Sequence, residues 1–341
     1  MSLALRMVEK LFAHSPPLSG SRLLDAGCGR GTFIEAAIAY AKKMGWALPE
    51  AVCVERDPVL AEIARRRLGG LARVITGDFL LMSARELGLF DYIISNPPYI
   101  SYERIDPQLR EEYKRLFRVA QGRFDVYMLF FERALSLLKP GGRLVFVTPE
   151  KYMYTLSASE LRRLLAQHAV EEIEFVDERT FRGVLAYPAI TVVRREAPSG
   201  PTLVRLRDGR ELLVELPQDG SPWLAAIEGA LAPQKCVRLG DLALRISAGV
   251  ATGRDDVFVV PRDALPRGLE RFAYPTISGG ELAALRPGGE INYSRLRHVI
   301  LVPYSRDGRL LGEDEARLLL EYLARHRRVL EERYAVRRGK P

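Results

Sequence analysis

Cysteine and histidine are scarce in this chain of 341 residues. The three cysteines, Cys28, Cys53 and Cys236, show neither the spacing of a zinc site nor a pairing pattern. The four histidines are scattered along the chain, so no metal site is expected. Cys28 and Cys53 fall in or beside apolar runs, where a buried free thiol is the simplest interpretation.

Long apolar runs are also missing from the sequence. No stretch approaches the roughly 20 apolar residues of a membrane span, and residues 1–10 read as an amphipathic helix without the features of a signal peptide. We therefore expect a cytoplasmic protein with no membrane partner. A Gly-Lys-Ser/Thr loop is absent as well, which disfavours a P-loop nucleotide site.

The length and the charge of the chain set two further bounds. A chain of 341 residues exceeds most single cores, so two domains are expected. The Pro- and Gly-rich stretch 196–201 predicts the boundary, with domains at 1–197 and 198–341. The 51 basic and 43 acidic side chains give a net charge of +8, spread over both halves. This charge permits a phosphate-backbone partner, although a mildly basic solvated surface accounts for it equally well.

Apolar runs alternate with helical periods between residues 22 and 195. This alternation predicts an α/β domain: a Rossmann-like, mostly parallel seven-stranded sheet with helices on both faces. A smaller mixed α/β domain follows. The expected strands are 22–26, 51–55, 72–76, 90–95, 143–148, 171–176 and 189–194. The expected helices are 32–43, 58–68, 124–138 and 159–168.

A glycine-rich turn follows the first expected strand. It contains Asp25, Gly27 and Gly29 and opens a helix. Glycines allow a tight turn and close approach of a ligand to the backbone, and a helix N-terminus favours a carboxylate. The pattern indicates a bound adenosyl cofactor, while dinucleotide binding or a plain strand-to-helix turn also fits it.

Acidic side chains end the next two expected strands. Glu55 can accept hydrogen bonds from ribose hydroxyls, as acids at this position do in dinucleotide folds. Asp78 can accept from an adenine amino group, and Phe79 can stack on the ring. Helix or turn capping is the competing role of each acid. We expect all of them at one rim, because ligands bind at the carboxyl ends of such strands.

The tetrapeptide Asn96-Pro97-Pro98-Tyr99 follows the fourth expected strand. An exocyclic amine on a base is a poor nucleophile, because its lone pair is delocalised into the ring. Two acceptors aimed at its N–H bonds favour attack on a sulfonium methyl group and act most strongly as positive charge develops. Asn96 and Pro97 offer carbonyl oxygens, the prolines stiffen the backbone, and Tyr99 offers an aromatic face. The competing interpretation is a strand-ending turn.

These motifs resemble the catalytic domain of gamma-class adenine-N6 DNA methyltransferases of restriction–modification systems, of type II or IIG-like organisation. The runs 125–131 and 138–149 are similar to the helix and strand that follow the tetrapeptide in that family. The resemblance implies a site-specific, adenine-specific enzyme that uses S-adenosylmethionine. By the same resemblance, the cofactor residues are Asp25, Gly27, Gly29, Glu55, Asp78 and Phe79, and the catalytic residues are Asn96, Pro97, Pro98 and Tyr99.

The resemblance also implies double-stranded DNA as the partner, with the target adenine flipped out of the helix. Tyr99 and Phe181 are then expected to stack on the flipped base, with Tyr187 as the alternative to Phe181. The polar connection 100–123 is expected to contact DNA or to close over the base. A plain solvated helix from Pro107 to Val119 is equally consistent with the sequence.

Residues 198–341 are similar to target-recognition domains of the same enzymes, most clearly over 244–260, where two strand-like runs flank a glycine loop. The domain is expected to be incomplete, and the chain to act as a monomer with a fused or separately encoded restriction nuclease. Two alternatives stay open. RNA-base and protein-glutamine methyltransferases share the Asn-Pro-Pro-Tyr chemistry, and an inactive DNA-binding fragment would share the motifs.

Overall fold

The computed structural model describes residues 2–177, 187–231, 250, 252–277, 281, 292, 296–305 and 307–333. The chain forms two compact units, Met1–Cys236 and Val237–Pro341. Within the described residues, no helix combines the length and the apolar character needed to cross a membrane. The same residues contain no group of three or more His, Cys, Asp or Glu side chains arranged to hold a metal ion.

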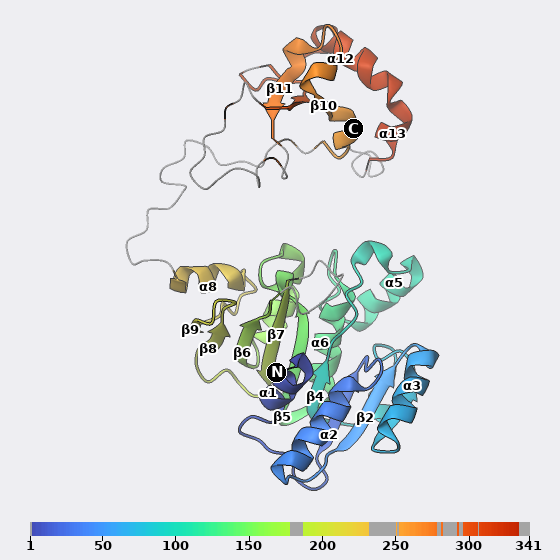
Figure 1. Cartoon of the computed structure of the whole chain (residues 1–341), viewed down its shortest axis with the longest axis vertical. Helices are drawn as coiled ribbons and strands as arrows, with labels where there is room; N and C mark the ends of the chain where they lie inside the picture. Colours follow the sequence, from blue (N-terminus) through green and yellow to red (C-terminus); the bar gives the residue numbers. More distant parts are fainter. Residues whose placement is uncertain are drawn as a thin grey trace. The chain divides into compact units, whose positions relative to one another are not determined.

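The first unit is built around a nine-stranded sheet with the order β3-β2-β1-β4-β5-β7-β6-β8-β9 (Figure 1). The strands β1 to β5, neighbouring in the sheet, run parallel to one another, and β7 is antiparallel to both β5 and β6. The strands are β1 (Arg22–Ala26), β2 (Glu50–Glu55), β3 (Ala72–Thr76), β4 (Phe90–Ser95), β5 (Leu138–Pro149), β6 (Ala169–Phe175), β7 (Pro188–Arg194), β8 (Thr202–Arg205) and β9 (Glu211–Val214).

Helices cover both faces of this sheet. One apolar cluster packs α1 to α3 against side chains such as Leu23 and Ile94, and a second packs α5 to α8 against side chains such as Leu24 and Ile93. Successive residues of a strand therefore place their side chains in the cores on opposite faces of the sheet, as a sheet covered by helices on both faces requires. The helices are α1 (Leu3–Phe12), α2 (Thr32–Met44), α3 (Pro58–Leu68), α4 (Ala84–Leu87), α5 (Pro107–Leu116), α6 (Val126–Leu137), α7 (Ser159–Leu165) and α8 (Trp223–Leu231).

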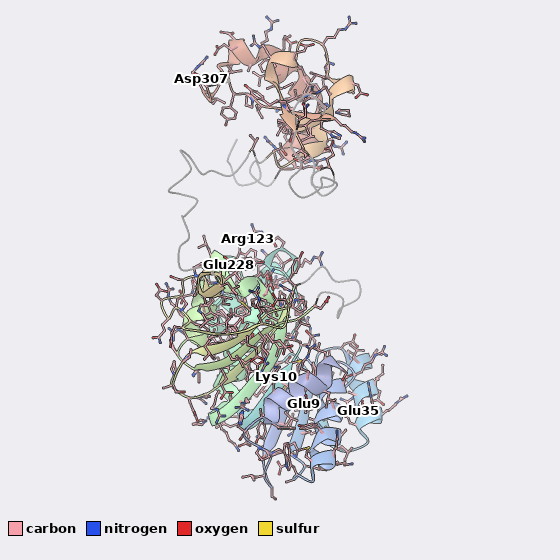
Figure 2. All side chains as sticks on the ribbon, turned by 60° about the vertical axis from the view of Figure 1, so that its left-hand side comes forward. Glu9, Lys10, Glu35, Arg123, Glu228 and Asp307 are labelled. Carbon is pink, nitrogen blue, oxygen red and sulfur yellow. The ribbon has the colours of Figure 1, made fainter. Side chains whose placement is uncertain are left out.

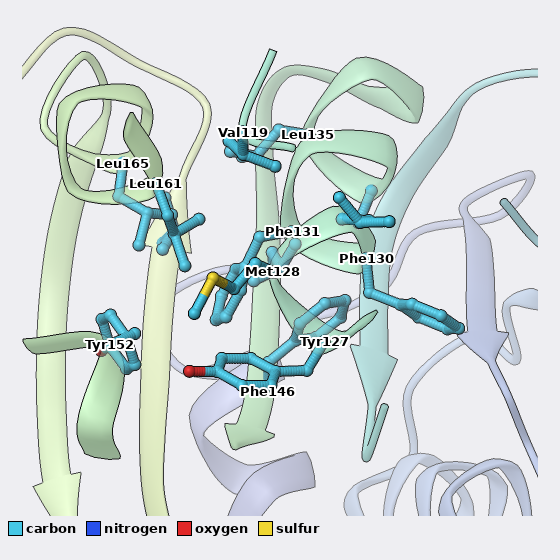
Figure 3. Close-up of a cluster of buried hydrophobic side chains, with 14 of the residues drawn as sticks. Val119, Tyr127, Met128, Phe130, Phe131, Leu135, Phe146, Tyr152, Leu161 and Leu165 are labelled. Carbon is cyan, nitrogen blue, oxygen red and sulfur yellow. The ribbon is translucent and has the colours of Figure 1, made fainter. Parts of the chain in front are cut away.

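Helix α6 supplies three aromatic side chains, Tyr127, Phe130 and Phe131, to the core on its side of the sheet. Figure 3 shows that Phe130 and Phe131 leave the helix in different directions. Phe131 packs 4.9 Å from Phe146 and 5.9 Å from Tyr152, measured between ring centroids. Phe130 instead lies 5.1 Å from Phe79, at the end of β3. One helix thus joins the centre of the core to the rim where the polar strand ends gather.

Ion pairs join α1 to strand β6. Lys10 of α1 (Figure 2) lies 2.6 Å from Glu172 and 2.8 Å from Glu174, between ammonium nitrogen and carboxylate oxygen. Arg6 makes a second contact with Glu174, at 2.7 Å. The Lys10, Glu172 and Glu174 side chains are largely shielded from solvent, so these pairs are screened less than ordinary surface pairs. They hold the first helix of the chain across the sheet.

All seven strands expected in residues 22–195 are present within a few residues of their expected bounds. The expected boundary at 197/198 is wrong, because the chain after it rejoins the sheet. Strand β8 pairs in parallel with β6, through Glu172–Leu203 and Glu174–Arg205, and β9 pairs with β8. The Pro- and Gly-rich stretch is therefore a loop between two strands of one sheet. The first compact unit runs on to Cys236.

The second unit contains a small antiparallel sheet with the order β10-β12-β11. Its described core is formed by Leu269, Phe272, Leu301 and Leu319. The second strand-like run of 244–260 differs from expectation, because its first part forms a one-turn helix before the strand begins. The elements are α10 (Asp255–Phe258), β10 (Val259–Pro261), β11 (Ala273–Thr276), β12 (His298–Leu301), α12 (Glu313–Arg325) and α13 (Arg327–Glu331).

Candidate active site

A cavity of about 690 Å³ lies at the carboxyl ends of the parallel strands, a usual volume for a small-molecule site. Parallel strands end at one edge of a sheet, so residues far apart in sequence meet there. The cavity brings together six of the residues that the sequence singles out. These six lining residues are Gly27, Glu55, Asp78, Phe79, Asn96 and Pro98.

Hydrogen bonds connect the glycine turn between β1 and α2 to the end of β2. The amide N–H groups of Gly27 and Cys28 both donate to the Val54 carbonyl oxygen, at 2.8 and 3.0 Å. The Gly29 N–H donates to the Glu55 carboxylate at 2.7 Å. Glu55 also accepts from the Asp57 N–H at 2.8 Å, so its two oxygens hold the turn and the start of α3 in register. Each oxygen keeps a further acceptor site for a ligand hydroxyl.

Gly31 is the residue of the turn that tolerates substitution least. Its φ of 78° is left-handed, and an added Cβ would stand 2.9 Å from Leu68 Cδ1. We expect Gly31→Ala to lower the free energy of unfolding by about 1–2 kcal/mol through the backbone and by about 1–3 kcal/mol more through overpacking. Gly29→Ala is the matched control, because Gly29 has a φ of 55° and nothing within 4 Å of its added Cβ. Urea unfolding of both variants measures the difference; equal losses would contradict the steric argument.

Asp25 is fully buried and does not line the cavity. Its position inside β1 explains this, because it pairs with Cys53 on one side and Ile94 on the other. Neither of its carboxylate oxygens has a hydrogen-bond partner within the part of the chain that the structure describes. Burial, assisted by the charge of Glu55, raises the pKa of Asp25 well above its usual value. The residue lies beneath the cofactor turn, so any action on a ligand passes through the turn.

The raised pKa of Asp25 predicts a pH dependence of stability. The unfolded chain releases this proton in the ordinary carboxyl range, whereas the folded protein retains it to higher pH. Stability therefore falls as the pH rises from the unfolded pKa toward the folded one. We expect Asp25→Asn to flatten this fall in urea unfolding between pH 4 and 8. Asp208→Asn is a control of opposite sign, because Arg210 lowers the pKa of the exposed Asp208. An unchanged slope in Asp25→Asn would contradict the assignment.

Asp78 and Phe79 stand at the end of β3, on the cavity wall. Asp78 accepts from the Leu80 N–H at 3.0 Å and lies 3.6 Å from the Arg56 guanidinium. Both the turn role and the ligand role weighed for this acid are therefore compatible with its position. Phe79 is only 3% exposed and packs at 42° against Phe130. The two rings form an apolar floor for a flat ligand.

The tetrapeptide continues directly from β4. The Asn96 side-chain oxygen is buried and has no hydrogen-bond partner among the described residues, although Asn96 lines the cavity. Pro97 is buried, and Pro98 is exposed at the cavity wall. The Tyr99 hydroxyl donates to the Val147 carbonyl oxygen of β5 at 3.2 Å, which fixes its ring, and burial raises its pKa. A buried acceptor without a partner is costly, so the Asn96 oxygen is a candidate acceptor for a donor group of a ligand.

The remaining wall of the cavity comes from residues that sequence reasoning did not assign. Helix α6 contributes Val126 and Phe130, and the segment that includes α5 contributes Ile105, Leu109 and Tyr113. Helix α5 therefore does not match the plain solvated helix from Pro107 to Val119. The available signals were the apolar spacing of these residues and the Asp-Pro pair that begins the helix.

Four carboxylates and two guanidiniums line the cavity, giving it a formal net charge of −2. The acids are Glu55, Asp57, Asp78 and Asp106, and the bases are Arg56 and Arg104. Such a lining attracts a cationic ligand and repels the phosphates of a dinucleotide. S-adenosylmethionine carries a sulfonium and an ammonium group against one carboxylate, so the residues present fit it. The alternative of dinucleotide binding is disfavoured.

Phe181 and Tyr187 are the two aromatic residues considered for the second face of the target base, and the structure describes only Tyr187. Phe181 lies outside the described residues. Tyr187 precedes β7 and is 50% exposed. The Arg207 guanidinium lies 5.5 Å from the Tyr187 ring centroid and 5.3 Å from the Phe175 ring centroid. Arg207 also pairs with Glu150, at the end of β5. Tyr187 thus lies beside the end of β5, where the Glu150 N–H donates to its carbonyl oxygen at 2.8 Å.

The first unit has the fold of the class I S-adenosylmethionine-dependent methyltransferases. A protein from Listeria monocytogenes described as a member of that class superposes with a TM-score of 0.50 at 20% identity, covering 60% of this chain and 62% of that one. The type IIL restriction-modification enzyme MmeI superposes with a TM-score of 0.59 at 15% identity, covering 94% and 50%. The predicted Rossmann-like fold is confirmed, and the predicted cofactor, S-adenosylmethionine, is the one that this class uses.

Sequence comparison narrows the class. Residues 55–181 match the family of Eco57I restriction-modification methylases. The type II methyltransferase M.PaeR7I of Pseudomonas aeruginosa is 27% identical over 77% of this chain and 50% of its own length. M.XhoI of Xanthomonas vasicola is 26% identical over 83% and 58%. The chain thus spans about half the length of these curated relatives. The predicted relationship to restriction–modification methyltransferases is confirmed.

Proposed function

We propose that this chain transfers a methyl group from S-adenosylmethionine to N6 of an adenine flipped out of duplex DNA. One observation carries the proposal. The buried, unpartnered side-chain oxygen of Asn96 belongs to the same cavity wall as Glu55 and Asp78. An acceptor for an amino group and acceptors for a nucleoside therefore share one cavity.

The proposed roles follow from the chemistry of each residue. Bound S-adenosylmethionine supplies an electrophilic methyl group. Asn96 and the Pro97 carbonyl accept the two N–H bonds of N6, which favours tetrahedral nitrogen and stabilises its developing positive charge. The methyl group would exchange its bond to sulfur for a bond to N6, and the proton that N6 loses would pass to water. Tyr99, held by its bond to Val147, stacks on the adenine, and Phe181 or Tyr187 covers the other face.

The remaining assignments extend the same proposal. Asp25, Gly27, Gly29, Glu55, Asp78 and Phe79 hold or shape the cofactor side. The second unit, Val237–Pro341, reads the DNA sequence in the grooves. A restriction nuclease, fused or separate, is the expected functional partner of a cytoplasmic, monomeric methyltransferase.

Transfer of a radiolabelled methyl group tests the proposal directly. Purified protein is incubated with methyl-labelled S-adenosylmethionine and mixed-sequence unmethylated duplex DNA, and the product is digested to nucleosides. We expect the label in N6-methyladenine. Label in another nucleoside would refute the choice of atom. Label in RNA or in a glutamine amide, offered in parallel, would refute the choice of substrate. An absence of label in every substrate would refute methyl transfer by this chain.

A further inference from the structure

Residues 101–125, which follow the catalytic tetrapeptide, form an excursion of the chain whose two ends lie side by side. It leaves at Ile100 and returns at Val126, where the Val126 N–H donates to the Ile100 carbonyl oxygen at 3.0 Å. Before returning, it is fastened to α6, because Glu132 accepts from the N–H groups of Arg118 and Val119 at 3.0 and 2.9 Å. The excursion is therefore anchored at both ends beside the candidate site.

The outer side of the excursion fixes the position of α5. The Tyr102 ring lies 4.6 Å from the Arg110 guanidinium and 6.0 Å from the Lys114 ammonium, measured to the ring centroid. The same ring meets Phe124 edge to face at 5.5 Å. Arg110 also donates two hydrogen bonds to the Ile105 carbonyl oxygen, at 2.8 and 3.0 Å. These contacts tie the helix to the chain that leaves the tetrapeptide.

The inner side of the excursion faces the cavity. Ile105, Leu109 and Tyr113 recur at every fourth position, so they share one side, and all three line the cavity. Tyr113 is 2% exposed, and its ring meets Phe117 edge to face at 6.1 Å. This apolar wall closes the same cavity as Asp78 and Phe79.

Tyr113 adds a hydrogen-bond donor to that wall. Burial and the nearby charge of Asp78 raise the pKa of its phenol to about 12, so it stays protonated at physiological pH. Asp78 is an acceptor only. The amino edge of adenine presents the complementary pair, because N6 donates and N1 accepts. Hypoxanthine inverts the pair, since its position 6 is an oxo acceptor and its N1 carries hydrogen.

We propose that Tyr113 is a specificity-determining residue of the cofactor site. It donates to adenine N1 while Asp78 accepts from N6, and Ile105 and Leu109 cover the ring. This inference rests on the proposed function, because it assigns residues to the cofactor of that reaction. It gives the excursion 101–125 a role in cofactor recognition, besides the DNA contact or base closure expected from its sequence.

Calorimetry with two matched ligands tests the assignment in the full chain. The ligands are S-adenosylhomocysteine and S-inosylhomocysteine, which differ at positions 6 and 1 of the purine. The key variant is Tyr113→Phe, which removes one hydroxyl and keeps the ring packed on Phe117. Gln108→Ala is the control, because Gln108 is an exposed residue of α5 outside the cavity lining. Leu109→Ala tests the apolar wall independently.

The wild type is expected to bind the adenosyl ligand much more tightly than the inosyl ligand. Tyr113→Phe should weaken the adenosyl ligand about tenfold and reduce the discrimination between the two ligands. Leu109→Ala should weaken both ligands alike, and Gln108→Ala neither. The assignment would be overturned if Tyr113→Phe became less stable and still preferred the adenosyl ligand as strongly as the wild type does. That result would leave the proposed function standing. Failure of the wild type to bind S-adenosylhomocysteine would overturn both.

Discussion

Asn96→Ala is expected to reduce methyl transfer to DNA by about 10²–10³-fold, the usual effect of removing one preorganised group that stabilises developing charge. The buried Asn96 oxygen has no partner among the described residues, and in the proposed mechanism it accepts an N–H bond of the reacting amino group. The turnover number should fall with little change in affinity for S-adenosylhomocysteine, because Glu55 and the glycine turn remain. Single-turnover transfer and calorimetry measure the two quantities.

Asn96→Asp is the matched variant for this prediction. It keeps an acceptor oxygen of the same reach, and it replaces the side-chain NH2 group by a second oxygen and a negative charge. We expect it to retain far more activity than Asn96→Ala, since the carboxylate can still accept one N–H bond of the target amine. Equal activity of Asn96→Ala and the wild type would refute the catalytic role. Equal loss in both variants would contradict the view that an acceptor oxygen at this position is sufficient for catalysis.

The part of the cavity that is formed by the strand ends was foreseeable from the sequence. Glu55, Asp78 and Asn96 each terminate or directly follow an apolar run, and parallel strands bring such positions together. The glycine turn was equally predictable from the sequence, because few residues other than glycine adopt its left-handed backbone conformation. These features follow from local rules of chain geometry, which a single sequence records.

The other part of the cavity was not foreseeable because it depends on long-range packing. Whether α5 is solvated or folded inward is decided by where Tyr113 and Phe117 find apolar partners, which its own sequence does not state. Asp25 shows the same limit. Its motif indicates a ligand, whereas its place within β1 buries its carboxylate beneath the turn. The false boundary at 197/198 arose because Pro and Gly mark loops as readily as linkers.

The rejoined sheet also explains the environment of Arg162, a buried arginine with no carboxylate partner among its described contacts. Its guanidinium donates to the carbonyl oxygens of Gly220 and Ser221, on the chain between β9 and α8. It also donates to the carbonyl oxygens of Tyr152 and Thr155, in the loop after β5. A planar group with five donors is suited to hold several carbonyls at once. Arg162 therefore connects the segment between β9 and α8 to the loop after β5.

Arg162→Met is accordingly expected to lower the free energy of unfolding by about 3–5 kcal/mol, because it leaves several carbonyl oxygens without their donor. Arg163→Met is the matched control on the same helix. Arg163 is about half exposed, pairs with Glu160 and donates one hydrogen bond to the Asp219 carbonyl oxygen at 2.8 Å. Water can replace both contacts at this exposed position, so its loss should amount to about 1 kcal/mol or less. Urea denaturation of the two variants separates them. Similar small losses would mean that water replaces the guanidinium, and the connection between the two segments would then be weak.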